Sequence, residues 1–129
     1  MNEVDVLIPE SDEEYLQEKG FEYELKSQDG AIHLILKNVA FSEAFNMRQA
    51  DILIVIPAGY PNSNLDMFWT CPHVRLLNGD YPAACNYFEN FHDRNWQRWS
   101  RHGLWRGGVD NLRTFISSIK KEIDHTLSP

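Results

Sequence analysis

Two cysteines, Cys71 and Cys85, are the side chains in this sequence best suited to nucleophilic chemistry. A thiolate is a strong nucleophile, and a thiol at a helix N-terminus loses its proton more easily than a free one. Cys85 follows an Asn-Gly turn and a proline that suits the first turn of a helix, which favours a nucleophilic role. A cysteine inside a helix is more often a small buried residue, and Cys71 ends an apolar strand, where structural cysteines are common.

His102 is a further candidate catalytic residue, because Ser100 and Asp110 lie near it in the sequence. Serine, histidine and aspartate side chains together form hydrolytic triads. The sequence has no Gly-x-Ser-x-Gly motif of the kind that presents a nucleophilic serine, so a hydrolase is the least favoured reading. The histidines and carboxylates also lack a His-Glu-x-x-His or similar spacing, and the sequence therefore predicts no metal site.

The Arg/Trp segment, residues 94–106, is basic and aromatic in an otherwise acidic chain. It holds four of the seven arginines, although the net charge of the chain is −7. If residues 96–102 form a helix, Arg98, Arg101 and His102 share one side and the tryptophans share another. The segment is then either an amphipathic helix anchored by its tryptophans, or a site for a carboxylate or acidic tail of a partner. In the second interpretation the partner-binding residues are Trp96, Arg98, Trp99, Arg101, Trp105 and Arg106.

Composition limits the class of protein. The length of 129 residues indicates one domain spanning residues 1–129, and a hydrophobic content of 43% is sufficient for a folded core. The acidic net charge argues against general nucleic-acid binding. No apolar run is long enough to span a membrane, and Met1–Val6 does not resemble an export signal. We therefore expect a cytoplasmic protein with free thiols and no membrane partner.

Strands must position the candidate residues. Five consecutive apolar residues at 52–56 predict a strand buried on both faces, which Pro57 ends. Alternating apolar residues predict a hairpin of strands at 21–26 and 31–37, and a fourth strand begins near Met67. The short connections between these strands favour an antiparallel meander of four strands.

Helices are expected at both ends of the chain and in its middle. Ser11 has capping-box spacing for a first helix that Gly20 ends, and residues 83–91 have an apolar side that suits a helix. Residues 109–126 carry an apolar stripe at helical spacing, with Asp110 as the N-cap. We therefore expect an α+β fold with an N-terminal helix, a four-stranded antiparallel meander and C-terminal helices packed on the sheet.

The order of motifs in Asp51–Thr70 resembles the centre of the ubiquitin-conjugating enzyme (UBC) fold. An apolar strand ends in a proline, a Tyr-Pro turn follows, and the next strand is aromatic. Further segments resemble the prokaryotic family E of these folds, namely LIPESDEEYLQEKGFEYEL, DMFW, WQRWSRH and WRGGVDNL. The resemblance extends from about Leu7 to Ile123 and implies a UBC-like fold for the whole domain.

The resemblance also implies where the chemistry would lie. In ubiquitin-conjugating enzymes a cysteine carries a ubiquitin-like protein as a thioester, and an upstream His-Pro-Asn turn provides an asparagine assigned to oxyanion stabilisation. Here Cys71-Pro72-His73 is the counterpart of that turn, with His73 at the asparagine position. Cys85 is the counterpart of the catalytic cysteine, although it lies farther from Gly79 and from Trp105 than the usual register of the family. Such chemistry requires no metal or nucleotide, so we expect no cofactor.

Two functions of different classes follow from the resemblance. The first is transfer of a ubiquitin-like protein in a bacterial conjugation pathway, by a thioester if Cys85 is the nucleophile. The second is a non-catalytic UBC-fold adaptor that binds the modifier or its activating enzyme through the Arg/Trp segment. The implied partners are a ubiquitin-like protein, a ThiF-type activating enzyme and a JAB-type isopeptidase, in a pathway that would serve defence against phage. Fold-level analogy does not choose between the two functions.

Overall fold

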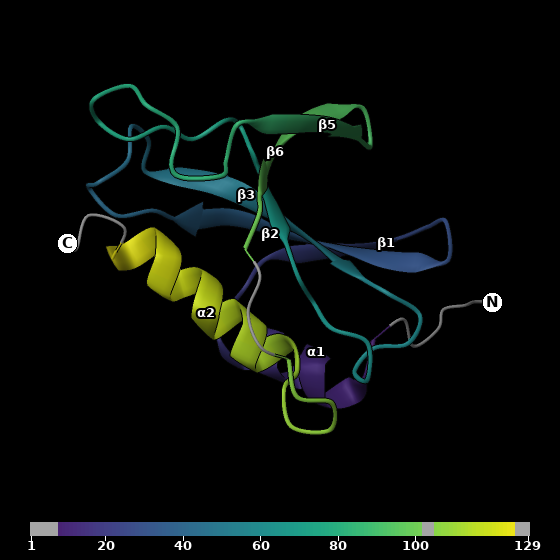
Figure 1. Cartoon of the computed structure of the whole chain (residues 1–129). Helices are drawn as coiled ribbons and strands as arrows, with labels where there is room; N and C mark the ends of the chain where they lie inside the picture. Colours follow the sequence, from purple (N-terminus) through teal and green to yellow (C-terminus); the bar gives the residue numbers. More distant parts are fainter. Residues whose placement is uncertain (1–7, 102–104, 126–129) are drawn as a thin grey trace.

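A computed structural model of the chain describes residues 8–101 and 105–125. Figure 1 shows two helices on one side of a curved sheet, with the β5–β6 hairpin at the far side of the molecule. The elements in chain order are α1 (Glu10–Glu18), β1 (Tyr23–Gln28), β2 (Ala31–Ala40), β3 (Gln49–Ile56), β4 (Phe68–Cys71), β5 (Tyr87–Phe91), β6 (Arg94–Trp99) and α2 (Leu112–His125).

The strands form one antiparallel sheet with the order β1-β2-β3-β4-β6-β5. Its first four strands follow one another as a meander, and the α+β class is confirmed. The prediction of a four-stranded sheet is wrong, because the β5–β6 hairpin extends the sheet beyond β4 to six strands. The prediction of several C-terminal helices is also wrong, since α2 alone follows the sheet within the described residues.

Strand β3 lies at the centre of the sheet and is buried on both faces, as its unbroken apolar run predicts. Ile52 and Ile54 face the helices, while Leu53 faces the other side, and all three side chains are at most 1% exposed. Strand β2 supplies the same alternation, with Leu34 on the helix side and Ile35 on the opposite side. The sheet therefore has a covered face, toward α1 and α2, and an open face on the other side.

Two segments between β4 and α2 whose patterns suited helices contain strands instead: β5 lies within 83–91, and β6 covers most of the described part of 96–102. A helix at residues 96–102 would place Trp96 and Trp99 on one side, whereas strand β6 sends them to opposite faces, where each is fully buried. The predicted helix at 83–91 is interrupted at Ala84, whose φ of 56° lies in the left-handed region that a helix cannot include. Non-local packing of two large indole rings thus overrides the local helical pattern.

The boundaries of α1 follow from its flanking residues. Its N-cap is Pro9 and no side chain caps it, so the predicted capping box at Ser11 is wrong. Gly20 follows the C-cap Lys19 with a φ of 74°, which confirms the predicted end of the helix. Neither helix, as far as the described residues extend, is long and apolar enough to cross a membrane.

Candidate functional site

A cleft lies between α2, the chain that leads into it and the residues at the start of β4. Its volume is about 330 Å³. Two predicted partner-binding residues, Arg101 and Trp105, line it. The other lining residues combine an apolar floor with polar walls, and are Leu65, Asp66, Phe68, Asp110, Thr114, Phe115, Ser118, Ile119 and Glu122. This mixture suits a partner segment that carries both apolar and polar groups.

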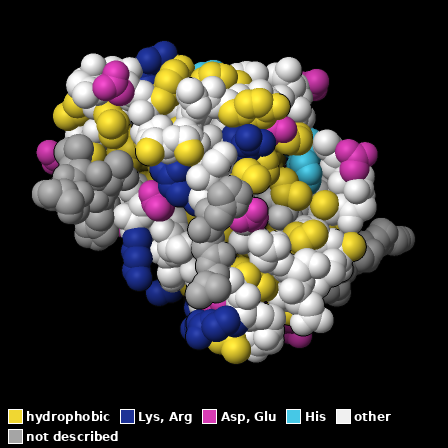
Figure 2. Space-filling model, in the orientation of Figure 1, with side chains coloured by type: hydrophobic (Ala, Val, Ile, Leu, Met, Phe, Trp, Pro, Cys, Tyr) yellow, Lys and Arg dark blue, Asp and Glu magenta, His cyan; other side chains and the backbone are white. Residues whose placement is uncertain are grey.

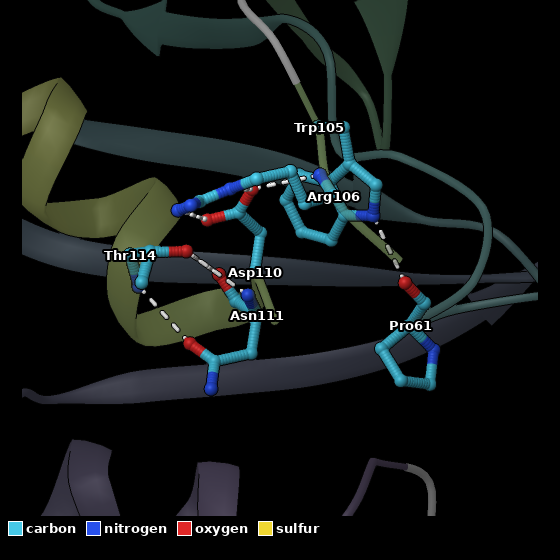
Figure 3. Close-up of polar contacts among 6 residues, drawn as sticks. All are labelled: Pro61, Trp105, Arg106, Asp110, Asn111 and Thr114. Atoms are coloured by element: carbon cyan, nitrogen blue, oxygen red, sulfur yellow. Dashed lines mark hydrogen bonds and ion pairs between the residues drawn. The ribbon is translucent and has the colours of Figure 1, made fainter. Parts of the chain in front are cut away.

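The WRGGVDN motif forms one wall of this cleft through bonds to its own turn and to the Tyr-Pro turn (Figure 3). The Trp105 indole N–H donates to the carbonyl oxygen of Pro61 at 2.9 Å. Arg106 donates through its backbone N–H to Asp110 at 2.8 Å, and its guanidinium pairs with the same carboxylate. These hydrogen bonds and the positive guanidinium lower the pKa of the Asp110 carboxyl. The wall is therefore held by contacts within residues 105–110 and by Pro61, which lies in a turn far away in the sequence.

Asn111, rather than the predicted Asp110, caps α2. The backbone N–H of Thr114 donates to the Asn111 side chain at 3.1 Å, and the backbone N–H of Asn111 donates to the Thr114 hydroxyl oxygen at 2.9 Å. This reciprocal pair is a capping box, and Figure 3 shows both side chains at the helix start. The helix begins at Leu112, three residues after the predicted Val109.

Tyr60 joins the Tyr-Pro turn to both helices. Its hydroxyl donates to Asp12 of α1 at 2.6 Å and accepts from the backbone N–H of Leu112, at the start of α2, at 2.6 Å. Burial raises the pKa of the Asp12 carboxyl, and the hydrogen bond from Tyr60 acts in the opposite direction. Burial and the neighbouring Asp12 also raise the pKa of Tyr60. The tyrosine of the turn thus holds the helices in place beside the cleft.

Cys85 lies behind Arg101, inside the core. Its side chain is 0% exposed. Burial raises the pKa of the Cys85 thiol to about 11, although the Arg101 guanidinium acts in the opposite direction. The Arg101 Nη2 atom is 3.7 Å from the sulfur, and Arg101 also pairs with Glu122 at 3.1 Å. In this conformation the thiol is neutral at neutral pH and out of reach of a partner.

Gln97, which is not among the predicted site residues, joins the two segments expected to carry the chemistry. Its side-chain oxygen accepts from the Thr70 hydroxyl at 2.9 Å and from the backbone N–H of Val74 at 2.7 Å. Its amide nitrogen donates to the carbonyl oxygens of Val74 and Cys85, both at 2.9 Å. Gln97 is 0% exposed, so its amide is a buried polar group with every hydrogen-bonding position used. The signal that could have identified Gln97 was a glutamine at a strand position facing the core. The local sequence pattern did not reveal that strand.

The histidines that were candidate catalytic residues have different outcomes. His73 lies immediately before Val74, its Nε2 atom is 2.7 Å from Asn95 Oδ1, and its ring stacks on Phe88 at 4.5 Å. Gln97 therefore brings the His73 segment close to the Cys85 segment. His102 lies outside the described residues, so the arrangement of a triad with Asp110 is not tested, although Asp110 is already bound to Arg106.

The Arg/Trp segment is largely internal. Trp96 and Trp99 are fully buried, so their side chains do not form part of the surface. Each arginine of the segment pairs with a carboxylate of this chain: Arg94 with Asp51, Arg98 with Glu89, Arg101 with Glu122 and Arg106 with Asp110. Figure 2 likewise shows basic and acidic side chains close together on the face it presents. Among the described arginines and tryptophans of this segment, the side chains that reach the surface are those of Arg94, Arg98, Arg101, Trp105 and Arg106.

Comparison with known proteins supports the resemblance seen in the motifs. No group of three or more histidine, cysteine or acidic side chains that could hold a metal occurs in the described part of the chain. Searches of curated proteins and of solved structures found no match. The family model described as prokaryotic E2 family E matches residues 8–126, which is nearly the whole chain. The chain therefore belongs to the prokaryotic E2 family E.

Proposed function

We propose that this chain binds a ubiquitin-like protein, or the enzyme that activates it, without forming a thioester at Cys85. Membership of the prokaryotic E2 family supports a ubiquitin-conjugating-enzyme-like role in general, and with it these two partners. Within that role the chain acts as an adaptor in a bacterial conjugation pathway. A JAB-type isopeptidase belongs to the same proposed pathway, and phage defence is its proposed purpose.

The observation that carries the proposal is the environment of Cys85. A nucleophilic cysteine needs an accessible thiolate, and catalytic sites commonly lower the thiol pKa to obtain one. Here the side chain is 0% exposed and burial raises the thiol pKa to about 11. The carbonyl of the same residue is held by Gln97 at 2.9 Å. Every one of these features is expected of a structural cysteine.

The proposed binding surface consists of Arg101, Trp105 and Arg106 at the edge of the cleft. The Arg106 side chain is 68% exposed, so its positive charge is accessible from solvent. Trp105 presents an indole ring beside it, anchored through Pro61. An exposed arginine next to a fixed aromatic ring favours a partner with a carboxylate or an acidic segment.

The test mixes the protein with its cognate activating enzyme, ubiquitin-like protein and ATP, and measures intact mass with and without reductant. We expect no adduct on the conjugating-enzyme-like chain, while the activating enzyme itself becomes charged. Binding is measured separately for Arg106→Ala and for Arg48→Ala, a matched exposed arginine outside the Arg/Trp segment. Arg106→Ala should weaken binding about tenfold or more, which corresponds to about 1.4 kcal/mol, and Arg48→Ala should not.

A second candidate function, transfer of the modifier, is favoured by one observation. The Arg101 guanidinium lies 3.7 Å from the Cys85 sulfur, and a neighbouring cation stabilises a thiolate once the site opens. A reductant-sensitive adduct that disappears in Cys85→Ser would establish this function and refute the adaptor. An adduct that resists reductant and yields to hydroxylamine would instead indicate an oxyester on a hydroxyl group.

A further inference from the structure

The turn between β5 and β6 brings a second histidine against the buried His33. The Nε2 atom of His92 is 3.0 Å from the Nδ1 atom of His33, and the two rings are nearly perpendicular with centroids 5.0 Å apart. These residues are far apart in the sequence, so the contact fastens the tip of the hairpin to strand β2. Phe91, beside His92, packs edge-on against the same His33 ring at 5.4 Å.

The turn that carries His92 has a backbone conformation that residues other than glycine rarely adopt. Phe91 and Arg94 pair across a two-residue loop, and the loop residues His92 and Asp93 have φ values of 54° and 65°. Such loops strongly prefer Asn-Gly and similar pairs, so a histidine here costs backbone energy. The contact with His33 is one that glycine or alanine at position 92 could not make.

The contact depends on the protonation of both rings. In a hydrogen bond between two imidazoles one nitrogen donates and the other accepts, so at least one ring must be neutral. When both rings are protonated, two donors and two positive charges face each other. His33 is 4% exposed, and burial together with the neighbouring His92 lowers its pKa. The closed hairpin therefore resists the uptake of a proton at His33.

Other charged groups around His33 also influence its pKa, but they do not reverse the preference of the closed hairpin for a neutral His33. Lys26 of β1 is its register partner on the same face of the sheet and adds positive charge. Asp29, in the turn between β1 and β2, acts in the opposite direction and raises the pKa of His33. On the hairpin side, Arg94 is paired with Asp51 at 3.0 Å.

We propose that His33 and His92 form an acid-sensitive latch that holds the tip of the β5–β6 hairpin on the open face of the sheet. Above the ordinary histidine pKa of about 6.5 the latch is closed. In an opened hairpin His33 regains its ordinary pKa, whereas in the closed state that pKa is depressed, so acidification below about 6.5 favours the open state. Opening uncovers the aromatic cluster of Phe91, Trp69 and Trp96, which then becomes available as a surface.

The test is amide hydrogen exchange by NMR at about pH 7.5 and about pH 5.5, on either side of the ordinary histidine pKa, with correction for intrinsic exchange rates. In the wild-type protein the protection factors of the hairpin-tip amides should fall on acidification, by at most about tenfold, because the lower pH lies about one unit below the ordinary histidine pKa. The amides that pair β2 with β3 should keep their protection. His92→Asn tolerates the left-handed turn and removes the second imidazole, so its hairpin amides should lose clearly less protection on acidification than those of the wild type.

His73→Gln is the matched control, because His73 also touches the hairpin, through Asn95. This variant should keep the wild-type response to pH. The latch is refuted if His92→Asn loses protection as the wild type does, or if the wild-type hairpin keeps full protection at the lower pH. A uniform loss of protection through β2 and β3 as well would also refute it, since that result indicates global unfolding rather than local opening.

Discussion

The covered and open faces of the sheet are held together by different interactions, although strand β6 contributes to both. On the covered face its Trp99 and Gln97 join a large apolar core, and the Gln97 amide is fully hydrogen-bonded there. On the open face Trp96 belongs to a small aromatic cluster. Around that cluster lie ion pairs such as Arg94 with Asp51, and the contact of His33 with His92.

The interactions of the two faces therefore differ in how strongly they depend on salt and pH. Buried neutral hydrogen bonds and apolar packing change little with salt or near-neutral pH, while ion pairs and histidine contacts respond to both. The covered face positions α1, α2 and the cleft. The open face carries ion pairs and histidine contacts whose strength depends on solution conditions.

Loss of the Gln97 amide should give the largest effect, and it would break the covered face. Gln97→Met keeps the length of the side chain but removes the acceptor of the Thr70 hydroxyl, which still accepts from the Trp99 indole. It also removes the side-chain partner of the Val74 N–H and of the Val74 and Cys85 carbonyl oxygens in the core. Since each buried unpaired group costs about 1–3 kcal/mol, we expect a loss of more than about 3 kcal/mol. Urea unfolding measures it, with Gln49→Met, at an exposed strand position, as the control expected within about 0.5 kcal/mol.

An intermediate effect on stability is expected from Asp12→Asn, because Asp12 is a titratable group buried on the covered side of the sheet. Because burial raises the pKa of Asp12 in the folded state, the wild type holds its proton to higher pH when folded than when unfolded. Stability from this group is therefore present at low pH and lost as the pH rises from 3.8 through the raised pKa. The variant should gain stability relative to wild type over that rise, because its side chain does not ionise.

Unfolding free energies of both proteins between about pH 3 and about pH 7 test this prediction, with the range bracketing a raised carboxyl pKa. Asn at position 12 can still accept the hydrogen bond from the Tyr60 hydroxyl, so the difference reports ionisation rather than a lost contact. A constant difference across the range would show that Asp12 has the same pKa in the folded and unfolded states.

The smallest effect is expected from the ion pair of the open face. Arg94→Lys keeps the positive charge and loses the guanidinium that pairs with Asp51 at 3.0 Å and lies over the Trp96 ring. Half-exposed ion pairs contribute about 0–1 kcal/mol, so the loss should be below about 1 kcal/mol and should shrink at high salt. Thermal unfolding at low and high ionic strength measures it. If Arg48→Lys, an exposed control, shows the same salt response, the effect does not belong to the pair.

Local patterns in the sequence predicted much of the sheet and both ends of the chain. The apolar run of β3, the hairpin of β1 and β2, and the Gly20 helix end were all readable because each depends on neighbouring residues. The same patterns failed between β4 and α2. There, Trp96 and Trp99 have a spacing that fits a helix, and only packing against residues far away in the sequence selects a strand.

The candidate site shows the same limit. Trp105, Arg106 and their motif could be identified from the sequence, and the structure places Trp105 on the wall of the cleft. The burial of Cys85 and the pairing of every arginine in the segment with a carboxylate could not be foreseen. Three of those carboxylates, Asp51, Glu89 and Glu122, lie on elements whose positions depend on the complete sheet. The fourth, Asp110, lies in a turn whose conformation the local pattern did not predict.

By itself, the sequence determined the α+β class, the central meander, the amphipathic helix α2 and membership of a UBC-like family, because local periodicity and contiguous motifs carry that information. The tertiary structure alone decided that Cys85 is buried, that Gln97 bonds to both the Val74 and the Cys85 segments, and that His92 meets His33. The physical reason is that burial, hydrogen-bond partners and pKa shifts are properties of neighbours in space. In this chain several of those neighbours meet at the β5–β6 hairpin, whose two buried indole rings pack against residues far away in the sequence.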